Sequence, residues 1–339
     1  MRRKRWLLLA LVLAVAATGC GGSDNQESGS PGGEGLTSVS FRLDWIADGS
    51  HTCFYSALSN GYFREENLDV QILEGSGSGT AANLVANGSN DFGFSDAGVV
   101  AKTINDGASI KLVMGIFQRN PSVIISLKEK GITRPQDLVG KSVGATSGEA
   151  PLQLLPAYLS ANNVDPTAAK VVNIDPAAKI TALLQKRVDA IVGYSSSDLP
   201  IAQSQAKGGL NVQHYADFGV VTLSNGVITS NKMISDQPDA VRGFTRAVQR
   251  GFEFCQAQPD EAVKQLTDRF PQTVKPDEAK IALQEVINNL HTDRTKGKPV
   301  GLMDSQDWSD TLATLQEYTG LSQPKAPETY YTNQFVQAG

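Results

Sequence analysis

The chain has 339 residues, with 30 Lys and Arg against 35 Asp and Glu, so its formal net charge is −5 at pH 7. Four of the basic residues lie among the first five positions, and the rest of the chain is clearly acidic, which excludes a broad basic surface for nucleic acid. About 300 residues follow the N-terminal segments, and this length favours two lobes over a single hydrophobic core.

The N-terminus carries the pattern of a secretory signal. Basic residues crowd the first five positions, and the stretch 6–17 that follows is almost wholly apolar. This run is about a dozen residues long, whereas a helix that spans a bilayer needs roughly twenty. We therefore predict a signal peptide over residues 1–19 and not a membrane anchor helix.

The end of this segment resembles the bacterial lipoprotein processing site. Small residues precede Cys20, whose thiolate can form the bond to a diacylglycerol. Residues 21–35 contain no aliphatic side chain and cannot bury a core, which is typical of a flexible tether. The resemblance implies a tether over residues 20–36 and a lipid on Cys20 that anchors the protein at the extracytoplasmic face of the cell membrane. An ordinary cleavage site beside a coincidental cysteine is the alternative.

Two further cysteines, Cys53 and Cys255, lie in the body of the chain. An oxidising compartment would allow them to form a disulfide. Both would also pack well as buried free thiols, since cysteine behaves as a small apolar residue. The sequence leaves these two possibilities open.

Strand and helix signals alternate along the first part of the body. The expected strands are 39–43, 70–73, 91–94 and 110–116, and the expected helices are 52–60, 81–86 and 99–105. The alternation predicts an α/β fold with a largely parallel sheet and helices on both of its faces.

The same alternation restarts at Pro121. Further strands are expected at 122–127, 141–145, 170–174, 188–192, 212–215, 220–223 and 227–229, with helices opening near Ser147, over 177–185 and throughout 238–320. The chain would thus build one lobe from residues 37–121 and 223–339 and a second lobe from residues 122–222. Two hinge crossings, near Pro121 and at 222–225, would join them.

Candidate ligand-binding residues follow from the position of the strand ends. In open α/β sheets ligands bind at the carboxyl ends of the strands. After the first strand come Asp44, Trp45 and, a turn later, His51, and the Trp ring offers a flat face for stacking unless it packs in the core. The residues selected after the other strands and at the crossings are Ser95, Asp96, Asn120, Ser147, Gly148, Tyr194, Asp198 and Asn225.

The glycine-rich stretch 75–80 adds Ser78, Gly79 and Thr80 to this set. Glycines before a helix leave backbone N–H groups open to an anion or another acceptor. The spacing fails the dinucleotide fingerprint, and no strand-end acid lies about twenty residues further on. A flexible structural turn is the alternative.

The strand-end acids outnumber the bases. The only base among these residues is Arg119, and the four acids are Asp44, Asp96, Glu149 and Asp198. An anion beside unpaired carboxylates is costly, so this balance favours a neutral or amino-bearing ligand.

Several short motifs together resemble one group of periplasmic binding proteins, which bind thiamine pyrimidine precursors, sulfonates, nitrate or riboflavin. These motifs are Leu43-Asp44-Trp45, Gly61-Tyr62-Phe63, Leu68-Asp69-Val70, Asp91-Phe92-Gly93, Gly131-Ile132, Val188-Asp189-Ala190 and Ser224-Asn225-Gly226. The resemblance covers nearly all of residues 37–320, and the Asp-Trp pair leans toward the pyrimidine-binding branch. It implies the two-lobed type II fold, a ligand in the cleft, and delivery by a monomer to a membrane permease powered by an ATPase.

The resemblance also implies roles for particular residues. Trp45 and Tyr194 would face each other across the cleft and sandwich an aromatic ring, and Asp198 would accept a hydrogen bond from an exocyclic amine. One branch of the group is a pyrimidine synthase that consumes its own histidine, and His51 lies at a comparable place. No cysteine-rich stretch follows it here, however, and the chain carries an export signal.

We therefore expect an exported solute-binding lipoprotein and not an enzyme. The ligand would be a small aromatic heterocycle, with a thiamine pyrimidine precursor first and riboflavin next. An alkanesulfonate, taurine or nitrate binder of the same architecture and an exported synthase are the alternatives. The three histidines, His51, His214 and His291, lack metal-ligand spacing, so we expect neither metal nor cofactor.

Overall fold

A computed structural model describes residues 35–336, of which Leu36 onward belongs to one compact unit. The predicted signal peptide and Cys20 lie outside the described residues. Within the described range, no helix combines the length and the apolar character needed to cross a membrane.

The first sheet has the strand order β2-β1-β3-β10-β4. Its strands are β1 (Thr37–Arg42), β2 (Leu68–Leu73), β3 (Phe92–Asp96), β4 (Ile110–Gly115) and β10 (Asn225–Ser230). β1 pairs in parallel with β2 and β3, whereas β10 runs antiparallel to both of its neighbours. We call this sheet and the helices that pack on it lobe 1.

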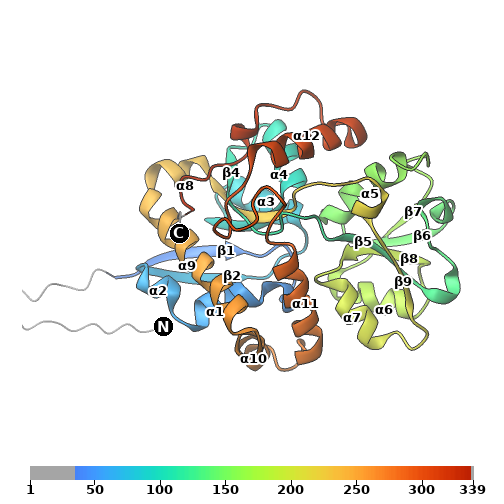
Figure 1. Ribbon diagram of the computed structural model, residues 1–339, viewed down its shortest axis with the longest axis horizontal. Helices are drawn as coiled ribbons and strands as arrows, with labels where there is room; N and C mark the ends of the chain where they lie inside the picture. Colours follow the sequence, from blue (N-terminus) through green and yellow to red (C-terminus); the bar gives the residue numbers. More distant parts are fainter. Residues whose placement is uncertain (1–34, 337–339) are drawn as a thin grey trace, which may run out of the picture. The chain divides into compact units, whose positions relative to one another are not determined.

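The second sheet repeats this plan with the order β7-β6-β8-β5-β9. Its strands are β5 (Ser122–Leu127), β6 (Ser142–Ala145), β7 (Lys170–Asn173), β8 (Ala190–Tyr194) and β9 (Leu210–His214). β6 is parallel to β7 and β8, and β5 is antiparallel to β8 and β9. We call this sheet and its helices, drawn in greens in Figure 1, lobe 2.

The two sheets confirm the α/β class and the two-lobed arrangement. The expectation of a largely parallel sheet holds for four of the five strands in each sheet, and the fifth lies inside the sheet and is antiparallel to both of its neighbours. That strand is the one that follows a crossing: β5 enters lobe 2 and β10 returns to lobe 1. The lobe boundaries predicted from the sequence stay a prediction.

Helices cover both sheets (Figure 1). The α-helices are α1 (Thr52–Ser59), α2 (Tyr62–Glu65), α3 (Ser78–Ala86), α4 (Ala97–Asn105), α5 (Ala150–Ser160), α6 (Lys179–Leu184), α7 (Asp198–Gln205), α8 (Asn231–Asp236), α9 (Pro238–Ala257), α10 (Pro259–Arg269), α11 (Pro276–Asn288) and α12 (Ser305–Thr319). Short 3-10 turns are η1 (Gly49–His51), η2 (Lys128–Lys130), η3 (Pro135–Leu138), η4 (Pro176–Ala178), η5 (Tyr215–Phe218) and η6 (Pro327–Thr329).

Two sequence predictions are wrong. Residues 220–223 form no strand, because the second crossing passes here and its backbone bonds elsewhere: Leu223 N donates to Thr311 Oγ1 (2.9 Å) and Ser224 N to Phe117 O (2.8 Å). The helical pattern over 238–320 is interrupted between α11 and α12, where Gly301 instead forms a bridge with Gly115 of β4.

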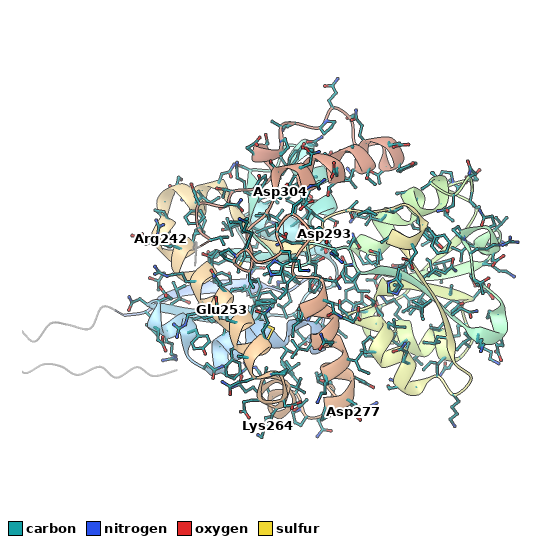
Figure 2. The ribbon with its side chains drawn as sticks, viewed as in Figure 1. Arg242, Glu253, Lys264, Asp277, Asp293 and Asp304 are labelled. Carbon is teal, nitrogen blue, oxygen red and sulfur yellow. A yellow bond between two sulfur atoms is a disulfide. The ribbon has the colours of Figure 1, made fainter. Side chains whose placement is uncertain are left out.

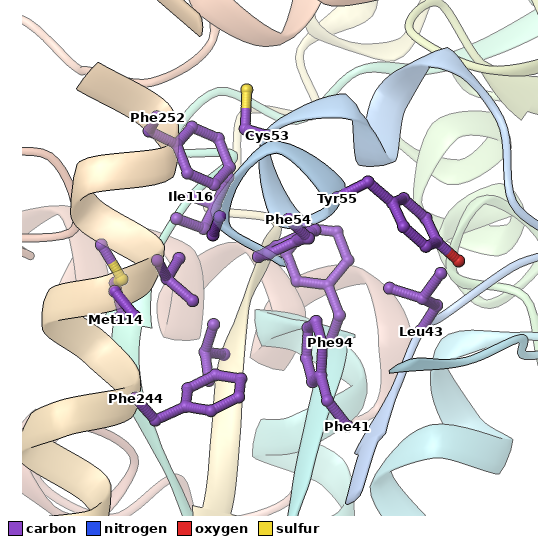
Figure 3. Packing of buried hydrophobic residues seen from close by; sticks show 14 of the residues in the cluster. Phe41, Leu43, Cys53, Phe54, Tyr55, Phe94, Met114, Ile116, Phe244 and Phe252 are labelled. Atoms are coloured by element: carbon purple, nitrogen blue, oxygen red, sulfur yellow. The ribbon is translucent and has the colours of Figure 1, made fainter. Parts of the chain in front are cut away.

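The core of lobe 1 is built from aromatic side chains that converge from β1, β3 and the helices on one face of the sheet (Figure 3). Val39 and Phe41 alternate inward along β1, and Phe244 lies on the buried face of α9. The Phe41 ring contacts Phe54 and Phe244 edge-on, with centroids 5.0 and 5.2 Å apart. Edge-to-face packing of this kind adds roughly 1 kcal/mol per pair beyond area burial.

A disulfide ties two helices of this core together. Cys53 of α1 and Cys255 of α9 are bonded, with Cα atoms 5.8 Å apart. The structure thus favours the paired arrangement over the two free thiols that the sequence left open. Since α1 follows directly on the segment that carries His51, the bond holds one wall of the cleft against the longest helix of lobe 1.

Helix α12 contacts both lobes. It packs on α4 of lobe 1 and on α5 of lobe 2. Its buried Trp308 stacks on Tyr331, and Leu312 and Leu315 belong to one apolar cluster that continues into both lobes. The lobes are therefore joined by apolar packing along α12 as well as by the two crossings.

Candidate functional site

A small cavity lies between the lobes at the carboxyl ends of their strands. Its lining comes from lobe 1 through Asp44, Trp45, Ser50, Gly77 and Ser78, and from lobe 2 through Glu149, Ala150, Pro151, Tyr194, Ser197 and Asp198. These residues follow β1, β2, β6 and β8, as the strand-end rule predicts. The cavity measures about 20 Å³, which is room for one or two water molecules. The lobes are closed on each other around it.

Two glycine turns bring the lobes into backbone contact beside this cavity. Gly79 N, at the start of α3, donates to Gly148 O of lobe 2 at 3.0 Å. A Cβ on Gly77, whose φ is +136°, would lie 2.8 Å from Gly148 O. The glycines therefore allow one main chain to reach the other.

This contact revises the expectation that these amides stay open to an anion. The Gly79 amide is used by Gly148 O, and Ser147 N donates to Asn173 Oδ1 at 3.0 Å. Thr80 N turns back to Gly77 O at 3.0 Å. Each of the three amides thus has a partner within the protein in the closed arrangement.

A buried histidine joins two acids on the lobe 1 side. His51 Nε2 lies 2.9 Å from Asp44 Oδ1, and Nδ1 lies 3.3 Å from Asp48 Oδ1. Burial alone would lower the pKa of His51, but the carboxylates of Asp48 and Asp44 raise it to about 10. His51 is therefore an imidazolium at neutral pH, with the Asp44 and Asp48 carboxylates as its counter-charges.

Hydrogen bonds connect Asp44 and Asp48 to residues of lobe 2. Asn225 Nδ2 donates to Asp44 Oδ2 at 2.7 Å, and the Tyr194 hydroxyl donates to Asn225 Oδ1 at 2.8 Å. Ser197 Oγ of lobe 2 also donates to Asp48 Oδ2. The strand-end acids of lobe 1 are thereby linked to the last residue of β8 and the turn after it.

The lobe 2 side holds a second buried cation. Lys179 Nζ lies 2.7 Å from Glu149 Oε2 and 3.1 Å from Asp198 Oδ2, and its side chain is fully buried. The ammonium also lies over the ring of Trp45 from lobe 1, 4.5 Å from its centroid. Burial raises the pKa of Glu149 and of Asp198, and the neighbouring Lys179 opposes that rise for both.

The structure distributes the fourteen predicted binding residues over four places. Those that line the cavity are Asp44, Trp45, Ser78, Tyr194 and Asp198. Buried behind it lie His51, Ser95 and Asn225. At the outer rim, where the glycine turns meet, lie Gly79, Thr80, Ser147 and Gly148. Asp96 and Asn120 lie beyond the buried residues, and Asp96 joins their hydrogen-bond network because Ser224 Oγ, which contacts Tyr194 and Asn225, donates to Asp96 Oδ2 at 2.9 Å.

Asp96 and Asn120 also stabilise the structure around them. Asp96 caps α4 by accepting from Gly98 N at 2.8 Å and Val99 N at 3.3 Å, and burial raises its pKa to about 6. Asn120 Nδ2 donates to Thr222 Oγ1 at 2.9 Å and so joins the two crossings. Neither side chain lines the interlobe cavity.

The expected sandwich of Trp45 and Tyr194 is only partly present. Both rings line the same cavity, but the Lys179 ammonium covers the Trp45 ring. Tyr194 has its hydroxyl turned to Asn225. Stacking of a ligand between the two rings remains a prediction that requires the cleft to rearrange.

Two functional residues were missed from the sequence: Ser50, which lines the cavity, and Lys179, which contacts three of the residues that line it. The position of Lys179 is a signal that could have found it, since it opens α6 a few residues after the end of β7. The count of acids against bases was therefore incomplete. Arg119, the one base counted, pairs instead with the exposed Asp293 at 2.8 Å, after α11 (Figure 2).

No cluster of three or more His, Cys, Asp or Glu with metal-binding geometry occurs among residues 35–336.

Comparison with known proteins identifies the family. A family model described as NMT1/THI5 like matches residues 48–262, which is more than half of the chain. The chain belongs to the NMT1/THI5-like family. The resemblance predicted from the sequence is confirmed at this level.

Two curated relatives carry different names: one is a binding protein and the other a synthase. The chain is 26% identical over 339 residues to the formylaminopyrimidine-binding protein of Halalkalibacterium halodurans, with 96% of each covered. It is 27% identical over 242 residues to the 4-amino-5-hydroxymethyl-2-methylpyrimidine phosphate synthase of Legionella pneumophila, covering 70% of this chain and 75% of the synthase.

Among solved structures, the alkanesulfonate-binding protein SsuA of Xanthomonas axonopodis pv. citri, bound to MOPS, is similar in fold. Its TM-score is 0.69 at 12% identity, over 88% of this chain and 100% of SsuA. The chain thus has the two-lobed periplasmic-binding-protein type II fold.

Replacing the buried histidine should change how stability depends on pH. The pKa of His51 is raised from about 6.5 to about 10 on folding, so its contribution is complete below pH 6.5 and is lost as the pH rises through 10. His51→Gln should lower the free energy of unfolding by about 3 kcal/mol at pH 6.5, because two buried carboxylates lose their cation. It should also flatten the decline between pH 6.5 and 10.

Urea titrations of residues 36–339 at several pH values measure both effects. His214→Gln serves as the control, since His214 ends β9 in the other sheet. Wild-type and His51→Gln curves that run parallel from pH 6.5 to 10 would contradict the ion-paired imidazolium.

A methyl group at the interlobe contact should oppose closure. In Gly79→Ala the new Cβ would lie 3.2 Å from Gly148 O, while alanine at this helical position favours α3 by roughly 0.5–1 kcal/mol. We expect unchanged or higher stability together with a more open protein. Small-angle X-ray scattering should give a larger radius of gyration than for Gly208→Ala, where the added methyl meets open space. Equal radii would show that the contact does not limit closure.

Proposed function

We propose that this chain is the solute-binding component of a bacterial ABC importer. It captures a small aromatic heterocycle between its two lobes and delivers it to a membrane permease powered by an ATPase. The observation that carries this proposal is the interlobe cavity at the strand ends, in a chain that aligns over 96% of its length with a formylaminopyrimidine-binding protein.

The geometry supports capture by closure. Residues from both lobes line the cavity, and the contacts across it are the Lys179 ammonium over the Trp45 ring and hydrogen bonds that water can replace when the lobes separate. A ligand that contacts both lobes stabilises the closed form by its differential affinity for that form. The permease would then distinguish loaded from empty protein by the closed arrangement.

The lining supports an amino-bearing ring. Trp45 and Tyr194 supply flat apolar surface, and Glu149, Asp198 and Asp44 supply acceptors. The curated relative that aligns end to end carries a pyrimidine in its name, and we place a thiamine pyrimidine precursor first and riboflavin second.

An alkanesulfonate, taurine or nitrate ligand is the alternative of the same class, and SsuA shares the fold. The amides at the two glycine turns have partners in the protein, and Arg119 lies outside the cavity. Lys179 and His51 are each engaged by two carboxylates. An anion would therefore have to compete with carboxylates for each of these buried cations.

An exported enzyme of the synthase branch is the alternative of another class, since several relatives carry that name. A histidine consumed in a reaction must reach the substrate. His51 is 1% exposed, lies between Asp44 and Asp48, and does not line the cavity. This placement supports a binding role over a reactive one.

A screen by thermal shift tests the ligand class. Residues 36–339 are heated with aminopyrimidines, thiamine, riboflavin, taurine, an alkanesulfonate and nitrate. A ligand at about a hundred times its dissociation constant adds roughly 2.7 kcal/mol of stability. We expect a shift with an aminopyrimidine or riboflavin that is lost in Trp45→Ala and kept in Trp308→Phe, which changes a Trp distant from the cavity lining. A shift with sulfonates or nitrate alone would contradict the proposed ligand class.

We also propose that the mature protein is a monomer held on the outer face of the cell membrane by a lipid on Cys20. The support is the sequence pattern around that residue, with its small residues before and polar tether after. Metabolic labelling with a fatty acid should mark the wild-type chain and not Cys20→Ala, which should appear in the medium or periplasm. Equal labelling of both would exclude Cys20 as the anchor.

A further inference from the structure

Three features that bind cations converge on one point of the cleft. Glu149 Oε2 and Asp198 Oδ2 lie 2.7 and 3.1 Å from the Lys179 ammonium, and the Trp45 ring lies beneath it at 4.5 Å. Paired carboxylates and an aromatic face are the combination that recognises organic ammonium groups. In this structure the ammonium group bound there is that of Lys179.

The Lys179 ammonium occupies the place where a ligand would bind. Glu149, Asp198 and Trp45 all line the interlobe cavity, and the space that remains is about 20 Å³. A heterocycle cannot lie against the Trp45 face or between the carboxylates while the ammonium is there. Either it binds elsewhere or it replaces the ammonium.

Charge decides between these two outcomes. Both carboxylates belong to lobe 2 and are nearly fully buried. Each accepts one backbone N–H, from Thr146 at 2.6 Å and from Tyr194 at 3.2 Å, so their two negative charges still need further cationic or N–H partners. An amino group on a flat ring supplies such donors and offers a surface to Trp45 at the same time. Lys179 begins α6 and carries a flexible four-carbon stem, so its ammonium can withdraw.

We propose that Lys179 is an internal competitor that occupies the ammonium subsite of Glu149, Asp198 and Trp45 until an amino-bearing ligand displaces it. This inference rests on the proposed function and deepens it by naming the chemical group of the ligand that the cleft recognises, an amino group. A flat ring without N–H donors cannot compensate the two carboxylates, and it is rejected. Lys179 therefore disfavours flat rings that offer no N–H donor to Glu149 and Asp198.

Chemical rescue tests the subsite without any natural ligand. Lys179→Ala removes three methylene groups and the ammonium, and n-propylammonium replaces those atoms. Thermal denaturation of this variant in n-propylammonium chloride should show a higher midpoint than in sodium chloride with 1-propanol. Wild type, in which Lys179 fills the subsite, and the double variant Lys179→Ala/Glu149→Gln should show no such difference. Equal midpoints for ammonium and alcohol in Lys179→Ala would overturn the subsite.

Competition is tested with a variant that keeps the volume but lacks the charge. Lys179→Met should bind 4-amino-2-methylpyrimidine roughly tenfold more tightly than wild type by calorimetry, since no ammonium has to leave the Trp45 face. Binding of 2-methylpyrimidine, which lacks the amine, should not tighten. Weaker binding of the amine by Lys179→Met would make Lys179 a ligand contact and overturn the proposal.

The two experiments separate this inference from the proposed function. Rescue of Lys179→Ala by n-propylammonium depends only on the subsite and holds even for a chain that transports nothing. A wild-type protein that responds to none of the heterocycles, together with successful rescue, would contradict the proposed ligand and leave the subsite standing. Failed rescue together with a pyrimidine response would overturn the subsite and leave the proposed function standing.

Discussion

Three of the four acids at the strand ends can be buried because each lobe supplies its own cation, whereas the fourth, Asp96, is capped by backbone N–H groups of α4. In lobe 1 His51 lies between Asp44 and Asp48, and in lobe 2 Lys179 lies between Glu149 and Asp198. Removing a charge from water costs several kcal/mol, and a close opposite charge returns most of that cost. Without these cations the carboxylates would have to take up protons or stay in water, and the cleft could not close over them.

The contacts that hold the lobes together across the cleft are of a weaker kind. Gly79 bonds Gly148 through the backbone, Ser197 bonds Asp48, and Tyr194 bonds Asn225. A hydrogen bond between neutral groups contributes about 1 kcal/mol net and one to a carboxylate about 1.5–3 kcal/mol, since water replaces each in the open form. Strong electrostatics therefore act inside each lobe and modest interactions act between them. That division lets a ligand shift the balance between open and closed forms with the free energy of a few contacts.

Much of the fold was predictable because its signals are local. The alternation of Val39 and Phe41 located β1, and the spacing of apolar residues from Val241 onward located α9. The second crossing was mistaken for a strand because its apolar residues follow the same pattern, while its hydrogen bonds go to Thr311 and Phe117, which lie far away in sequence.

The residues of the site were predictable only where they lie at or soon after the end of a strand. Asp44, Trp45, Tyr194 and Asp198 follow strands directly and were found. Lys179 was not, because nothing near it in the sequence signals burial. A lysine is buried only when partners from distant elements meet it, and here Glu149 and Asp198 lie 30 and 19 residues away. Its importance is a property of the tertiary arrangement.

The position of α12 has a consequence for how solute enters. This helix joins the lobes through apolar side chains that include Leu315 and the buried Trp308, and such packing does not exchange readily with water. The opposite rim, between α7 and α11, is joined by polar bonds from Ser195 to Glu285 and from Ser204 to Glu278. Separation of the lobes is therefore easiest at the α7–α11 rim, with α12 near the axis of rotation. In the function that we propose, solute would enter along this rim, and a permease would separate the lobes there to release it.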